Sequence, residues 1–150
     1  LKRSGVVANL RLKVRFDFVG RAKNGKMLIR AKSSEQVAEA LRQHKVAMIR
    51  NVPIQGITIE DIDMSQEVYS VYDEISGKEI AYAPVLVTFA ADSLEDAVRF
   101  SMKEEFRTIQ VLEPDDVHLT ALDIERLLMR VSNELLEYKR YLERKLNNWR

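Results

Sequence analysis

The chain of 150 residues contains no cysteine. This absence excludes disulfide bonds, cysteine nucleophiles and thiolate metal sites, and it favours an intracellular protein. No apolar run approaches the roughly 18–20 residues that are needed to cross a bilayer, so the sequence predicts a cytoplasmic protein with no membrane partner. Hydrophobic residues still make up 46% of the chain, which is enough to build a core.

Catalytic motifs are also lacking. The sequence has no Gly-x-Ser-x-Gly, phosphate-binding P-loop, dinucleotide fingerprint or His-Glu-x-x-His. Its two histidines, His44 and His118, have no second histidine or carboxylate at ligand spacing. The acidic group Glu60, Asp61 and Asp63 lacks EF-hand spacing, and we interpret it as a solvated loop. We therefore expect a non-enzymatic protein with no catalytic residue, cofactor or metal site.

Charge is segregated along the chain, although the net charge is only +1. Residues 1–50 hold 13 Lys/Arg against 3 Asp/Glu, whereas residues 51–128 hold 5 against 17. Residues 129–150 hold 6 against 3. Segregation on this scale predicts an electrostatic contact with nucleic acid, with another protein or with a second copy of the chain.

A basic hairpin is expected near the N-terminus. Residues 10–18 alternate between apolar and polar, which predicts a half-buried strand. Asn24-Gly25 predicts a two-residue turn whose register pairs Asp17 with Lys32 on the solvent side. No aromatic residue interleaves on that side, which disfavours base stacking. The basic residues on or beside it are candidate contacts for phosphates or an acidic protein: Arg11, Lys13, Arg15, Arg21, Lys23, Lys26, Arg30 and Lys32.

Two copies of a ββαβ unit are expected, over residues 1–54 and 55–114. In the first copy, Ser33 and Gln36 form a capping box for a helix over 34–44, and 46–52 reads as a strand. In the second copy, the expected elements are strands over 67–73 and 79–90 around a Ser76-Gly77 turn, a helix over 94–104 capped by Ser93, and a strand over 107–112. The sequence leaves open whether the sheets pair at their edges, stack, or form one ferredoxin-like sheet.

The third segment, residues 115–150, contains the clearest element. A helix over 121–148 begins at a Thr120–Asp123 capping box, and its apolar positions repeat every 3.5 residues, the coiled-coil period. At roughly 40 Å it is about twice as long as a typical strand. We expect its first half, 122–131, to pack on the sheet. The second half then needs a partner for its apolar residues: Leu135, Tyr138, Leu142, Leu146 and Trp149.

The sequence therefore predicts an α+β protein of one compact domain plus a helix. The leading hypothesis is a non-enzymatic assembly protein that forms a homodimer through the C-terminal helix. The alternative is a nucleic-acid-binding protein that uses the basic hairpin face. The third hypothesis is an enzyme whose site is assembled from scattered residues.

Overall fold

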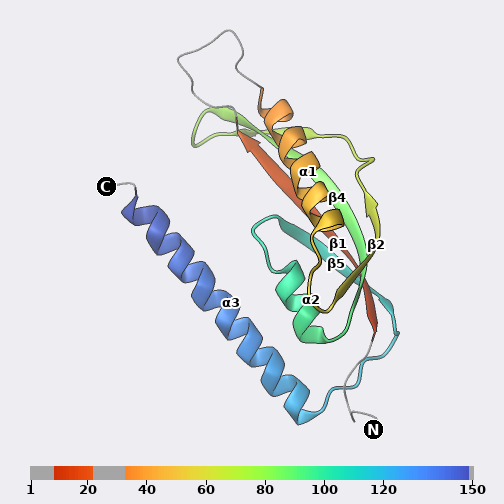
Figure 1. The fold of residues 1–150 in the computed structure, drawn as a ribbon. Coiled ribbons are helices and arrows are strands. Elements are labelled where there is room, and N and C mark those ends of the chain that lie inside the picture. The colour runs from red at the N-terminus through yellow and green to blue at the C-terminus, as the bar shows by residue number, and fades with distance from the viewer. Residues whose placement is uncertain (1–8, 22–32, 149–150) are drawn as a thin grey trace.

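The computed structural model describes residues 9–21 and 33–148, which form an α+β fold (Figure 1). A five-stranded antiparallel sheet is followed by a long C-terminal helix. The elements in chain order are β1 (Leu10–Arg21), α1 (Ser34–Asn51), β2 (Ile57–Asp63), β3 (Tyr69–Asp73), β4 (Lys78–Ala91), α2 (Leu94–Ser101), β5 (Phe106–Glu113) and α3 (Ala121–Asn147).

The long strands β1 and β4 form the centre of the sheet. The strand order is β2-β4-β1-β5, and β3 pairs with the other end of β4. Each crossover through a helix, β1–α1–β2 and β4–α2–β5, joins two strands that have a third strand between them. This is the split βαβ arrangement of ferredoxin-like sheets, which the sequence left open.

The prediction of a strand over 46–52 is wrong, because α1 continues through this segment to Asn51. A short apolar run does not distinguish a strand from a buried helix turn, and packing against the sheet favours the helix here. The described part of residues 1–54 therefore holds only β1 and α1, and the next strand, β2, begins at Ile57. The expected Asn24-Gly25 hairpin lies outside the described residues. Four hydrophobic or basic side chains of α1 are buried at helical spacing: Ala38, Arg42, Val46 and Ile49.

The expected turn and caps of the described residues are confirmed. The Ser76-Gly77 turn joins β3 to β4, with Gly77 at a φ of 71° that favours glycine. Ser33 and Ser93 each accept a hydrogen bond from the backbone N–H three residues later, as helix N-caps do.

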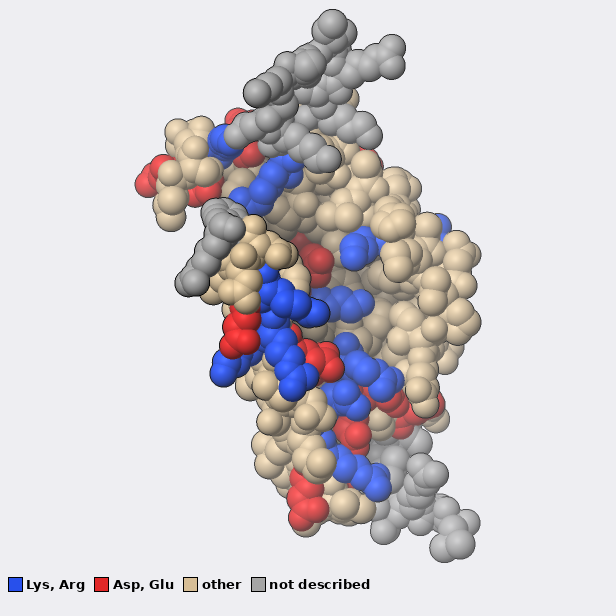
Figure 2. All heavy atoms as spheres, turned by 60° about the vertical axis from the view of Figure 1, so that its left-hand side comes forward, with Lys and Arg blue, Asp and Glu red and all other residues tan. Residues whose placement is uncertain are grey.

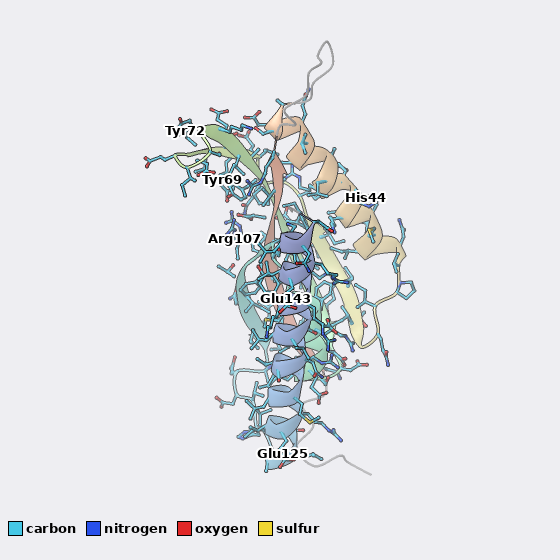
Figure 3. All side chains as sticks on the ribbon, turned by 90° about the vertical axis from the view of Figure 1, so that its left-hand side faces the viewer. His44, Tyr69, Tyr72, Arg107, Glu125 and Glu143 are labelled. Atoms are coloured by element: carbon cyan, nitrogen blue, oxygen red, sulfur yellow. The ribbon has the colours of Figure 1, made fainter. Side chains whose placement is uncertain are left out.

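The core lies between the sheet and the helices α1 and α2. Alternate residues of β1, from Leu10 to Phe18, face the helices and are buried, as the period of two predicts. Gly20 shares that face and lets α1 approach β1 closely, because a Cβ at this position would lie 2.2 Å from the backbone nitrogen of Ala38. The opposite side of the sheet carries Tyr69 and Arg107, away from α1 (Figure 3), and we call it the open face.

Pro84 lies neither in an edge strand nor at a bulge in the pairing of β4 with β1, the two settings in which a strand usually tolerates proline. It lies in the central strand β4, and its neighbours explain why it is tolerated. On the side away from β1, β2 pairs with residues 86–91 and β3 with residues 78–82, so neither strand reaches Pro84. The buried guanidinium of Arg42 occupies this gap and donates hydrogen bonds to the carbonyl oxygens of Pro84 and Gln66.

Candidate functional site

The helix α3 is covered by its own chain less than the other two helices of the described residues. It begins at Thr120, whose hydroxyl and the Asp123 carboxylate form the expected capping box. Over its 27 residues no side chain is buried. Its main contact is with α2, and it lies to one side of the sheet rather than across it (Figure 1). The prediction that residues 122–131 pack on the sheet is therefore wrong.

The exposed apolar residues of α3 form a continuous stripe. At 3.6 residues per turn, five of them fall within about 40° of one another around the helix axis. Leu135 is 62% exposed and Leu142 is 40% exposed. We call this set the outer stripe, and its members are Ile124, Leu128, Leu135, Leu142 and Leu146.

A different side of α3 faces its own chain. Its partly buried residues include Leu127, Val131 and Tyr141. Further along, α3 and the connection between α2 and β5 enclose an open groove of about 580 Å³, lined by Phe106, Tyr138 and other residues. The second half of α3 therefore flanks the domain without closing on it.

Four of the five predicted self-association residues lie in the described part of α3. Leu135, Tyr138, Leu142 and Leu146 are all exposed, and three of them belong to the outer stripe. Tyr138 lies beside the stripe, and it lines the groove together with Leu135 of the stripe. Trp149 lies outside the described residues.

The basic residues of β1 are partly neutralised by acidic segments of the same chain. Arg11 forms ion pairs with Glu60 of β2, at 2.5 Å, and with Glu113 of β5, at 3.7 Å. Glu60 belongs to a strand and not to the expected loop. The charges that are segregated along the sequence are therefore mixed in space, and basic and acidic side chains are interspersed on the face drawn in Figure 2.

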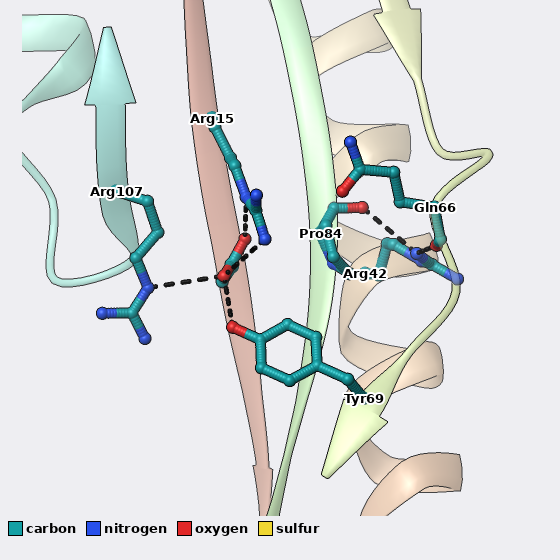
Figure 4. A network of polar contacts seen from close by, with 7 residues as sticks. Arg15, Arg42, Gln66, Tyr69, Pro84 and Arg107 are labelled. Carbon is teal, nitrogen blue, oxygen red and sulfur yellow. Dashed lines mark hydrogen bonds and ion pairs between the residues drawn. The ribbon is translucent and has the colours of Figure 1, made fainter. Parts of the chain in front are cut away.

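Asp17 is the centre of a polar network on the open face, and its side chain is only 2% exposed (Figure 4). Arg15 donates two hydrogen bonds to its carboxylate, at 2.8 and 3.2 Å, and the Tyr69 hydroxyl donates a third at 2.6 Å. Arg107 lies 3.4 Å away and stacks on the ring of Tyr82. The expected partner Lys32 lies outside the described residues.

The charge state of this network follows from its contacts. Burial raises the pKa of Asp17, but the hydrogen bonds from Arg15 and Tyr69 and the charge of Arg107 outweigh it, so the pKa lies below its ordinary value. Burial, followed by the hydrogen bond to Asp17, raises the pKa of Tyr69. The Asp17 carboxylate thus stays ionised and pairs with the guanidinium groups of both arginines. We therefore interpret the network as structural.

The remaining basic candidates are not brought into this network. Lys13 lies on the open face between Arg11 and Arg15, and Arg21 is exposed at the end of β1. Lys23, Lys26, Arg30 and Lys32 lie outside the described residues. Sequence reasoning did not identify Arg107 and Tyr69 as neighbours of Asp17, since they are 90 and 52 residues away and no local pattern links them.

Within residues 9–21 and 33–148, no cluster of three or more His, Asp or Glu side chains has a geometry suited to a metal ion. In the same part of the chain, no helix is long and apolar enough to span a membrane. Comparison of the chain with protein-family models, with curated proteins and with solved structures gave no match.

Proposed function

We propose that this chain is a non-enzymatic cytoplasmic assembly protein that self-associates as a homodimer through α3. The observation that carries the proposal is the exposure of the outer stripe along a helix with no buried residue. Contiguous apolar patches of this kind are uncommon on monomers and are typical of interaction surfaces.

A second copy is the simplest partner for this stripe. A two-fold axis places the same surface of both chains in one interface, so the stripe of each chain is buried against that of the other. The spacing of Leu128, Leu135 and Leu142 is seven residues, which keeps one face of the helix turned toward a partner helix. Charged residues of both signs flank the stripe, including Glu125, Lys139 and Glu143.

Sedimentation of two matched double variants tests the proposal. Leu135→Glu/Leu142→Glu places two carboxylates in the outer stripe. Met129→Glu/Leu136→Glu makes the same chemical change, at the same seven-residue spacing, at exposed positions off the stripe. We expect a dimeric wild type, a dimeric control, and a dissociation constant raised by on the order of 100-fold or more in the stripe variant. A wild type that stays monomeric at tens of micromolar overturns the proposal.

Nucleic-acid binding through the basic face remains the weaker proposal. Arg11 and Arg15 are engaged by Glu60 and Asp17, which reduces the positive charge available to phosphates. Lys13→Gln tests it, because this change removes a positive charge that forms no ion pair among those of the described residues. Salt-dependent retention on heparin that falls in the variant would support this proposal.

A further inference from the structure

The strand β5 is an edge of the sheet that lacks the usual protection. Among the strands of residues 9–21 and 33–148 it pairs only with β1, and seven of its eight residues are exposed. Edge strands that avoid pairing commonly carry lysine or proline or are covered by a helix. The eight residues of β5 include neither lysine nor proline. Register shifts occur at both ends of its pairing with β1, but the central segment 108–111 is regular.

The two faces of β5 carry different residues. Ile109 and Val111 lie opposite Val14 and Leu12 of β1, on the face that the helices cover elsewhere in the sheet. Ile109 is 41% exposed and Val111 is 49% exposed, although their partners on β1 are buried. The helices of the described residues therefore cover the apolar side of this edge strand only in part.

The position of α3 relates to this uncovered edge. Figure 1 shows α1 and α2 in front of the sheet, whereas α3 lies to one side of it with no strand behind it. In Figure 3, α3 runs between its labelled residues Glu125 and Glu143, while Arg107 at the start of β5 lies to one side. The β5 edge of the sheet and the helix α3, which carries the exposed outer stripe, therefore lie on the same side of the molecule.

We propose that β5 pairs antiparallel with β5 of a second copy, in a register centred on Gln110. This register places Ile109 opposite Val111 of the other copy, so that the exposed apolar residues form cross-strand pairs. Arg107 and Glu113 each lie three residues from Gln110, and their side chains reach Asp17 and Arg11 on the open face. Each Arg107 then faces a Glu113 of the other copy, which gives two complementary charge pairs.

This inference rests on the proposed self-association and specifies its geometry. Pairing of the two β5 strands extends the five-stranded sheet into a continuous ten-stranded sheet across the two-fold axis. The two α3 helices, each lying on the β5 side of its own sheet, are then brought toward the sheet and helices of the other copy. In this proposal the pairing covers the strand edge, and the contact through α3 covers the outer stripe.

Cysteine crosslinking tests the register directly, because the chain has no cysteine of its own. Gln110 faces itself across the axis, and directly opposed residues in an antiparallel pair have Cα atoms about 4.5–5.5 Å apart, which suits a disulfide. Thr108 faces the same side of β5 but lies opposite Leu112 of the other copy. Two Thr108 residues are then about 13 Å apart along the strand, beyond the reach of a disulfide.

We expect Gln110→Cys to form a covalent dimer in most of the protein under mild oxidation, and Thr108→Cys to remain at least tenfold less crosslinked. Sedimentation of both variants under reducing conditions shows whether they still associate. Dimeric variants with no preferential crosslink at residue 110 would overturn the β5 pairing while leaving self-association through α3 intact. A protein that is monomeric under reducing conditions would overturn both proposals.

Discussion

The helices α1 and α3 begin with the same local chemistry and end in different environments. Both have a capping box, formed by Ser33 with Gln36 and by Thr120 with Asp123. Helix α1 has 18 residues and buries five of them against the sheet and the residues around it, whereas α3 has 27 residues and buries none. Local capping and periodicity therefore define a helix, while burial depends on whether a second surface covers its apolar side.

The close packing of α1 has a specific cause in the sheet. Gly20 removes the side chain that would separate β1 from α1, and Arg42 ties α1 to the carbonyl of Pro84. Helix α3 has no such anchor in the sheet, and its main contact is with the short helix α2. The difference indicates that α1 belongs to the core of the monomer and that the outer stripe of α3 serves a contact outside it.

The largest expected difference in the free energy of unfolding is between truncation of an apolar side chain in the core and truncation of one in the outer stripe. Phe89 is 0% exposed and packs edge to face on Phe100, with ring centroids 4.7 Å apart. Phe89→Ala should lower the free energy of unfolding by about 4 kcal/mol. Leu135→Ala should change it by less than about 0.5 kcal/mol when the protein is dilute and monomeric. Urea unfolding of both variants measures this, and equal losses would contradict the distinction between core and outer stripe.

The polar network around Asp17 should produce the next largest effect. Asp17→Asn leaves Arg15 and Arg107 without their carboxylate and should cost about 2 kcal/mol at neutral pH, because both arginines remain partly exposed to water. The pKa of Asp17 is lowered in the folded protein, so its stabilisation is fully present above the unfolded pKa of about 4 and is lost as pH falls through the folded value.

Urea unfolding at neutral pH and near pH 3 checks this dependence. The difference between wild type and Asp17→Asn should shrink at the lower pH. Asp61→Asn, the same change at an exposed position of β2, serves as the control and should have little effect at either pH. A difference for Asp17→Asn that does not change with pH would contradict the ionised network.

The smallest expected difference in the free energy of unfolding is between variants of the two helix caps. Ser33→Ala should lower the free energy of unfolding by about 1 kcal/mol, because it removes the N-cap of a helix that is part of the core. Thr120→Ala removes the same type of cap, but the dilute monomer should lose much less, since α3 can fray without opening the core. Chemical denaturation of the two variants at low concentration measures both. An equal loss would show that α3 unfolds together with the domain.

Local signals in the sequence predicted much of this fold. The caps, the alternation of β1, the Ser76-Gly77 turn and the extent of α3 were predicted because each depends on neighbouring residues. The strand β2 was missed because a register shift between Ile59 and Asp61 interrupts its alternation. The full length of α1 was missed because its second half is apolar enough to resemble a strand.

The candidate site was predicted only in part. The apolar period of α3 identified its exposed residues, but the sequence did not show that the first half of the helix packs away from the sheet and leaves Ile124 and Leu128 exposed. The pairing of Arg11 with Glu60 and of Asp17 with Tyr69 joins residues about 50 positions apart, and sheet order decides such contacts. The charge segregation was evident in the sequence, whereas its neutralisation within the chain required the fold.

Hydrogen exchange of backbone amides at two protein concentrations, about 1 µM and about 100 µM, tests the covering of α3 most directly, with α1 as an internal reference. If a second copy covers the outer stripe, amides of α3 around Leu135 and Leu142 should exchange at least tenfold more slowly at the higher concentration. Amides in the buried turns of α1 around Val46 should exchange at the same rate at both concentrations. Protection of α3 that does not depend on concentration would contradict the account.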